Sequence, residues 1–238
     1  MLIAAIGDIH SPRFFDQYVK AIEDLQEKPD IFFLLGDIVY HGKVEEYQKV
    51  YNVLFGRITC PIIACFGNEE HGEETRMLIE NQNPDIKFLD EESLILEIGG
   101  KTVGIVGTIG SLDRPTYWQR NNIPGIYDIY KKRVETVESL LTSLKTEMKI
   151  LLIHYAPTYK ILEGENPQSF PELGSKAYER VIIEQKPNIV ITGHSHKGSK
   201  EAWIDTVPIF NVAFPLNRTI VVIDTEKDLK PGLEKFLE

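Results

Sequence analysis

Five short apolar runs constrain this chain most, because each is followed at once by side chains that can bind a metal ion. Their shortness and their apolar character on both faces are typical of buried strands in a mostly parallel sheet, which predicts an α/β protein. The runs are Leu2 to Ile6, Ile31 to Leu35, Ile62 to Phe66, Ile150 to Ile153 and Ile189 to Ile191.

Helical periodicity lies between these runs. It is clearest over residues 126–144, where apolar residues recur at spacings of three and four and predict a covering helix. Further strands are predicted over residues 94–98, 102–106, 201–211 and 219–224, the first two forming a hairpin around Gly99 and Gly100. We expect this second set of strands to form another sheet.

Seven potential metal ligands follow the five apolar runs. They are Asp8, His10, Asp37, Asn68, His154, His194 and His196. The carboxyl ends of parallel strands meet where ligands bind in open α/β sheets, so we expect these side chains to converge at one edge of one sheet. Imidazole, carboxylate and amide donors without a thiolate favour Mn, Fe, Zn, Co or Ni. The pattern therefore predicts a metal centre rather than a cysteine-based structural zinc site.

The motifs also resemble those of a known family. Gly-Asp-Ile-His, Gly-Asp-Ile-Val, Gly-Asn, a late His and Gly-His-Ser-His occur in the order of the calcineurin-like metallophosphoesterase signature. The resemblance covers essentially the whole chain. It implies a four-layer α/β/β/α sandwich, with two mixed sheets flanked by helices, and two divalent metal ions, of which manganese is the first candidate.

The resemblance also implies roles for the seven ligands. One ion would be bound by Asp8, His10, Asp37 and His196, and the other by Asp37, Asn68, His154 and His194. A bridging Asp37 would hold the ions about 3.5 to 4 Å apart, where a shared hydroxide attacks phosphorus in line. The implied activity is hydrolysis of a small phosphodiester or phosphomonoester. The catalytic candidates are Asp37, Asn68, Glu69 and His154.

The third motif departs from the family pattern. The chain has Glu69 where relatives carry a histidine that is thought to protonate the leaving group. Because an ordinary glutamate has a pKa of about 4.3, such a carboxyl is ionised at neutral pH and is a poor acid. His71 could supply the proton instead, or could simply be solvated. The alternative to an enzyme is a metal-binding scaffold of the same fold with little or no turnover.

Substrate contacts are predicted around the same edge. The candidates are His41, His71, Arg114, Trp118 and Arg120. Three of them lie in segment 108–133, a possible cap, whose residues 111–133 carry five basic and two acidic side chains. Arginine forks and aromatic faces suit a phosphate that bears an aryl or nucleoside group. The alternative is that these charges only face water.

The net charge of the chain limits the classes of molecule that it is expected to bind. The formal net charge of −10 makes nucleic acid an unlikely partner and leaves a small phosphate ester as the expected substrate. No apolar stretch approaches the roughly 18 residues that span a bilayer, so we expect no membrane association and a cytoplasmic location. We expect residues 1–238 to form one domain, with a homo-oligomer possible.

Overall fold

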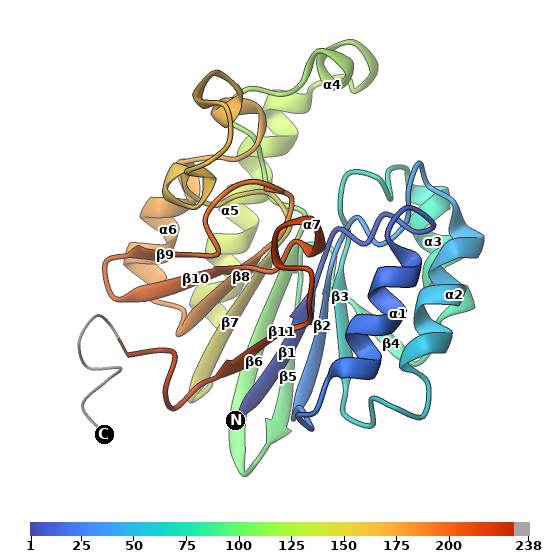
Figure 1. Cartoon of the computed structure of the whole chain (residues 1–238). Helices are drawn as coiled ribbons and strands as arrows, with labels where there is room; N and C mark the ends of the chain where they lie inside the picture. Colours follow the sequence, from blue (N-terminus) through green and yellow to red (C-terminus); the bar gives the residue numbers. More distant parts are fainter. Residues whose placement is uncertain (231–238) are drawn as a thin grey trace.

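The computed structural model describes residues 1–230, whose strands form two sheets packed face to face (Figure 1). The first sheet has the order β11-β1-β2-β3-β4. Strands β1 to β4 are parallel, and β11 pairs antiparallel with β1. The bounds are β1 (Leu2–Ile6), β2 (Ile31–Leu35), β3 (Ile62–Cys65), β4 (Ile86–Phe88) and β11 (Val221–Asp224).

The second sheet has the order β5-β6-β7-β8-β10-β9. Its four central strands are parallel, and antiparallel hairpins place β5 and β9 at the two edges. The bounds are β5 (Glu92–Ile98), β6 (Lys101–Thr108), β7 (Met148–Ile153), β8 (Ile189–Thr192), β9 (Glu201–Ile204) and β10 (Val207–Asn211). Both sheets are therefore mixed.

Helices cover the outer face of each sheet. The first sheet is covered by α1 (Phe15–Asp24), α2 (Val44–Leu54) and α3 (Glu73–Gln82), and the second by α5 (Ile126–Ser143) and α6 (Ala177–Gln185) (Figure 1). The shorter elements are α4 (Tyr117–Asn122), the 3-10 helices η1 (Tyr159–Leu162) and η2 (Pro167–Glu172), and α7 (Phe214–Asn217). The predicted α/β/β/α sandwich is confirmed.

Successive side chains of an inner strand point to opposite faces of its sheet and pack in two different hydrophobic cores. On β1, Ile3 and Ala5 lie in the core between the sheets, whereas Ala4 and Ile6 pack in the core under α1 and α2. A third core, which includes Val137 of α5, lies between the second sheet and its helices. Because each inner strand is covered on both faces, its sequence reads as a continuous apolar run.

The predicted division of the strands between the sheets is wrong. The five apolar runs do not share one sheet, since β1, β2 and β3 lie in the first sheet and β7 and β8 in the second. Segment 201–211 also divides at Asp205 into two antiparallel strands. The strands of the five runs are buried in both sheets, so hydrophobicity alone does not assign a strand to one of them. The carboxyl ends still meet, because Gly7 after β1 pairs with Ala213 after β10.

Candidate metal centre

The loops after three of the strands hold candidate ligands in an uncommon backbone conformation. Asp8, His10, Asp37 and His194 have φ values of 58°, 46°, 50° and 66°. Left-handed φ values are rare for residues other than glycine and cost about 1 to 3 kcal/mol each, so they persist where the surrounding structure imposes them. The fold thus fixes the direction of these four side chains.

Two glycines of the motifs are required by close approach. A Cβ atom on Gly67 would overlap the carboxylate and backbone nitrogen of Asp37, and one on Gly193 would lie 2.6 Å from Asp8 Oδ2. Any larger residue would therefore displace a candidate ligand.

One group of candidate ligands consists of Asp8, His10 and His196. His10 Nε2 and His196 Nε2 lie 3.3 Å apart, and His196 Nε2 lies 3.1 Å from Asp8 Oδ1. His10 Nε2 also lies 3.8 Å from Asp8 Oδ1 and 4.0 Å from Asp37 Oδ2. These nitrogen and oxygen atoms surround one point from three separate loops.

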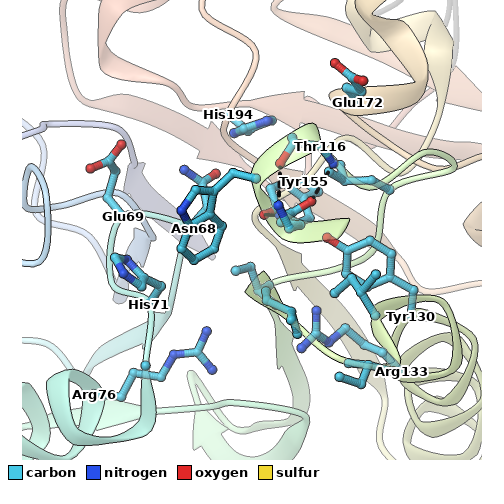
Figure 2. Close-up of a pocket in the computed structure, with 18 of the residues that line it drawn as sticks. Asn68, Glu69, His71, Arg76, Thr116, Tyr130, Arg133, Tyr155, Glu172 and His194 are labelled. Carbon is cyan, nitrogen blue, oxygen red and sulfur yellow. Dashed lines mark hydrogen bonds between the residues drawn. The ribbon is translucent and has the colours of Figure 1, made fainter. Parts of the chain in front are cut away.

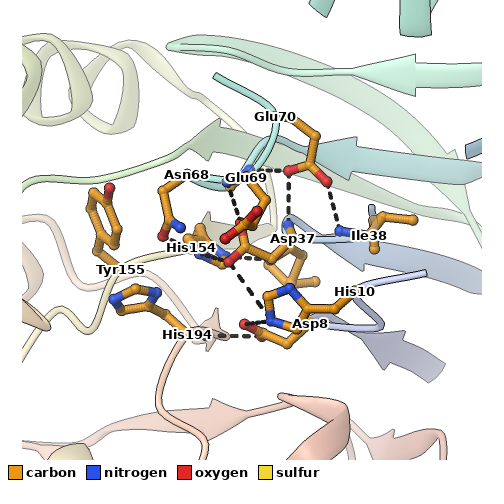
Figure 3. A network of polar contacts seen from close by, with 12 residues as sticks. Asp8, His10, Asp37, Ile38, Asn68, Glu69, Glu70, His154, Tyr155 and His194 are labelled. Atoms are coloured by element: carbon orange, nitrogen blue, oxygen red, sulfur yellow. Dashed lines mark hydrogen bonds and ion pairs between the residues drawn. The ribbon is translucent and has the colours of Figure 1, made fainter. Parts of the chain in front are cut away.

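The second group consists of Asp8, Asp37, His154 and His194 (Figure 3). His154 Nε2 lies 3.5 Å from Asp37 Oδ2 and 3.3 Å from Asn68 Oδ1, which places Asn68 beside this group. The backbone N–H of His194 donates to Asp8 Oδ2 at 2.9 Å. The structure therefore brings all seven candidate ligands together; Asp8 belongs to both groups, and Asp37 lies 4.0 Å from His10 of the first.

Electrostatics favour an ionised Asp37 in the protein alone. Burial would raise the pKa of the Asp37 carboxyl, but the charge and hydrogen bond of His154, with His10 and His194 nearby, hold it well below its ordinary value. Burial would likewise lower the pKa of His154, but the charge and hydrogen bond of Asp37 raise it. The ring is oriented by His154 Nδ1, which lies 2.8 Å from the carbonyl oxygen of Leu35. This leaves Nε2 facing the site.

The pKa values of the other three histidines are shifted in different directions. Burial lowers the pKa of His10, and burial with repulsion from His154 lowers the pKa of His194 to about 3. For His196, burial is outweighed by the hydrogen bond to Asp8, and its pKa is raised. Burial thus favours the neutral form of His10 and His194, which is the form that binds a metal ion.

The donor set fits divalent cations. Asp8 and Asp37 are 0% and 2% exposed, and within residues 1–230 their ion-pair partners are histidines, with no lysine or arginine among them. Buried carboxylates need a cationic partner, and oxygen and imidazole donors suit first-row divalent ions. Seven such donors are enough for two ions.

Glu70 is a part of this site that the sequence analysis did not identify. Its fully buried carboxylate accepts hydrogen bonds from the N–H groups of Asp37, Gly67, Ile38 and Val39, at 2.8, 2.8, 2.6 and 3.1 Å (Figure 3). Burial and the charge of Asp37 nevertheless raise the pKa of Glu70 to about 7. Glu70 ties the loops after β2 and β3 together. Its sequence signal was its position directly after Glu69 in the third motif.

Glu69 is held as a hydrogen-bond acceptor. Its Oε2 accepts from the backbone N–H of His41 at 2.6 Å and lies 3.4 Å from the His41 ring, while its own N–H donates to Asp37 Oδ1 at 2.8 Å. The Glu69 side chain is one-fifth exposed, whereas that of His41 is two-thirds exposed. Glu69 therefore lies between the ligands and solvent.

A cavity of about 630 Å³ opens beside the metal ligands (Figure 2). Asn68, Glu69 and His194 line it, together with the predicted contacts His41, His71 and Trp118. The rings of His71 and Trp118 lie 5.5 Å apart at 71°. Two sides of the cavity wall, the loop before α3 and helix α4, thus meet at these rings.

Two arginines that were predicted to contact the substrate do not line the cavity. Arg114 and Arg120 are not among the lining residues; Arg114 Nε lies 3.0 Å from Glu172 Oε1, and Arg120 donates to the Pro115 carbonyl. Arg76 and Arg133 line the cavity instead. Arg76 had no sequence signal, because it lies in an ordinary polar helix.

Among the described residues, none of the helices has the length and apolarity needed to cross a membrane.

Comparison with known proteins agrees with this geometry. The chain is 23% identical over 224 residues to a protein of Arcobacter nitrofigilis named as a probable glycerophosphodiester phosphodiesterase, GpdQ, covering 94% of this chain and 75% of that protein. The fold is similar to phosphopantetheinyl hydrolase of Mycobacterium tuberculosis, with a TM-score of 0.70, 15% identity and coverage of 89% and 88%. For the protein TT1561 of Thermus thermophilus, the TM-score is 0.59, the identity 17% and the coverage 94% and 98%.

The family assignment rests on the sequence as well as on the fold. A profile of calcineurin-like phosphoesterases matches residues 1–198, a span that contains all seven candidate ligands and ends just after the Gly-His-Ser-His motif. The chain therefore belongs to the calcineurin-like phosphoesterase family and is a metal-dependent phosphoesterase.

Proposed function

We propose that the protein hydrolyses small phosphodiesters at a dinuclear centre formed by Asp8, His10, Asp37, Asn68, His154, His194 and His196, with manganese as the first candidate metal. The observation that carries the proposal is the convergence of these donors around two buried carboxylates whose ion-pair partners within residues 1–230 are all histidines. Two divalent ions would polarise the phosphoryl group and acidify a shared water, the nucleophile of an in-line displacement.

The surrounding residues have distinct tasks in this proposal. Asn68 and His194 line both the centre and the cavity, so they orient the phosphate where the two meet. Glu69 and His71 line the cavity close to Asn68 and are the candidates to handle the proton of the leaving group. The cavity of about 630 Å³ receives the organic part of the ester.

Two features support a diester substrate. Glu69 carries a negative charge beside the phosphate position when ionised, which disfavours the doubly charged phosphate of a monoester more than the singly charged diester. The Arcobacter relative, 23% identical, is named for a phosphodiesterase activity.

The test is hydrolysis by metal-stripped protein to which Mn, Co, Ni, Zn or Mg is added back singly. We expect bis-p-nitrophenyl phosphate to be cleaved faster than p-nitrophenyl phosphate, with the highest rate in manganese. Faster cleavage of the monoester would overturn the diester assignment. No turnover with any metal, despite measured metal binding, would instead identify a scaffold.

A further inference from the structure

Two arginines lie across the cavity from each other, away from the metal ligands. Arg76 projects from α3, on the side of the first sheet, and Arg133 from α5, on the side of the second (Figure 2). His194 lies at the other end of the cavity in the same view. Neither arginine belongs to the donor set described above.

Arg76 is fixed in place by three contacts. Its Nε donates to the Glu70 carbonyl at 3.0 Å, its Nη1 donates to Asp90 Oδ2 at 2.5 Å, and its guanidinium lies 5.1 Å from the centre of the Phe66 ring. The side chain keeps 20% of its surface exposed. It is therefore held rigidly while part of it faces the cavity.

Arg133 is held in the same manner from the opposite side. Its Nη1 donates to the Gly110 carbonyl at 2.7 Å, its Nε lies 2.6 Å from Glu91 Oε1, and its guanidinium lies 5.8 Å from the Tyr130 ring centre. Only 13% of the side chain is exposed. Adjacent acidic residues, Asp90 and Glu91, thus position the two arginines.

These contacts do not use all the donors of either guanidinium. Within residues 1–230 the hydrogen bonds and ion pairs of both arginines engage Nε and Nη1. An arginine carries five N–H donors, so Nη2 of each retains donors for a ligand. Asp90 and Glu91 are not among the lining residues, so a ligand in the cavity meets the guanidiniums rather than the carboxylates.

Apolar side chains form a further part of the cavity lining. The lining side chains of this kind are Ile109, Leu112, Ile123, Ile126, Ile129 and Tyr130. A cavity that has arginines and candidate metal ligands in its lining, with apolar side chains beside them, favours a ligand that combines anionic groups with an apolar part. Preorganised arginine forks are suited to carboxylate and phosphate oxygens.

From these observations we infer that Arg76 and Arg133 form a second anion subsite, which selects phosphate esters whose organic part is apolar and ends in a carboxylate or a phosphate. The inference rests on the proposed function, because the scissile phosphate must lie at the metal centre. It adds a requirement at the far end of the substrate that the metal centre does not impose.

The test uses p-nitrophenyl phosphodiesters whose second arm is an alkyl chain of varied length. The chain ends in a carboxylate, a non-hydrolysable phosphonate or, as the neutral reference, a methyl ester. With the wild-type manganese-loaded enzyme we expect kcat/KM for an anionic arm of the best length to exceed the reference by roughly 10- to 100-fold, the range of one or two charged hydrogen bonds. Comparing carboxylate with phosphonate identifies which anion is preferred.

Variants assign the effect to the arginines. Arg76→Gln and Arg133→Gln should each bring the ratio of anionic to neutral substrate close to one. Arg57→Gln, at an exposed arginine paired with Glu23, should leave the ratio unchanged. A ratio near one in the wild-type enzyme at every length would overturn the subsite while leaving the phosphodiesterase intact. Absence of p-nitrophenol release from all substrates, the neutral one included, would overturn the proposed function and the subsite with it.

Discussion

Asp37 contacts residues from three other parts of the candidate metal centre. It lies 3.5 Å from His154 and 4.0 Å from His10, and it accepts the N–H of Glu69. Asp37→Asn keeps the shape but removes the charge that offsets a cation. Mutation of a residue that only hydrogen-bonds to a metal ligand already lowers metal affinity or activity by about 10- to 100-fold. Because Asp37 is itself a candidate ligand, we expect the activity of Asp37→Asn to fall below roughly one per cent of wild type.

The measurement is kcat with bis-p-nitrophenyl phosphate together with metal content per chain. Asp16→Asn, at an exposed position in the first turn of α1, serves as the matched control and should behave as wild type. Full activity of Asp37→Asn at normal metal content would contradict a role for this carboxylate.

Glu69 tests how the leaving group receives its proton. Glu69→His restores the residue that family members carry, while the backbone N–H that donates to Asp37 is unchanged. If protonation limits the rate, turnover should rise by up to about 100-fold for alkyl esters, the lower range for a general acid, and little for p-nitrophenyl esters. Rate constants for the two ester types, with His71→Gln measured alongside, check this. Equal changes for both types would show that another group donates the proton.

Glu70 should matter for stability as well as for activity. Glu70→Ala leaves four backbone N–H groups in the loops after β2 and β3 without their acceptor. A buried unsatisfied donor costs about 1 to 3 kcal/mol, so we expect the free energy of unfolding to fall by at least about 3 kcal/mol. Urea unfolding of the metal-free protein measures this, with Glu73→Ala, exposed on α3, as control. If Glu70→Ala lowered the free energy of unfolding no more than Glu73→Ala does, Glu70 would not hold the two loops together.

At the scale of single residues, the sequence pattern and the structure pointed to different residues of the candidate site. The convergence of the seven candidate ligands could be predicted because each follows a strand and matches a motif. Arg76 could not, and Arg133 was included only as one of five basic residues of segment 111–133, because the approach of helices α3 and α5 to the cavity depends on the packing of the two sheets. Arg114 and Arg120 were chosen from local charge, but neighbouring Glu172 lies within ion-pair distance of both.

At the scale of elements, the loops after the strands act as rigid supports for the ligands. Gly67→Ala tests this, because the added methyl group would overlap Asp37 in the neighbouring loop. We expect kcat/KM to fall by about 100-fold or more, since displacements near 1 Å already have effects of that size. The checks are activity and metal content.

Gly99→Asn is the matched glycine control. Gly99 has a φ of 59° in the β5–β6 turn and no atom within 4 Å of an added Cβ, and asparagine accepts this conformation. It should retain full activity. If Gly67→Ala did so too, the loop after β3 would have to be more adaptable than the close approach implies.

The elements themselves were largely predictable, whereas their pairing was not. Residues 94–98 and 102–106 form the expected hairpin, and residues 126–143 form the expected helix. However, β11 pairs with β1, more than 200 residues away in the sequence, and β7 and β8 lie in the other sheet. Partner choice depends on contacts between distant segments, which local periodicity does not contain.

For the whole molecule, bound metal should be a main source of stability. The carboxyl edges of both sheets meet at Asp8 and Asp37, so cations there would link the two halves of the sandwich. A ligand that binds only the folded state stabilises it by about 2.7 kcal/mol at 100 times its dissociation constant. Removing the metal should therefore lower the unfolding midpoint, and adding manganese back should restore it in a concentration-dependent way.

Thermal unfolding with and without chelator measures this effect in wild type and in Asp37→Asn. The variant should depend much less on metal, because the charge that attracts the cations is reduced where the two sheets meet. Its metal-free midpoint should be close to or below that of metal-free wild type, because neutralising Asp37 removes the attraction of His154, a loss that the relieved repulsion of Glu70 only partly offsets. Equal metal dependence in the two proteins would place the stabilising ions elsewhere in the molecule.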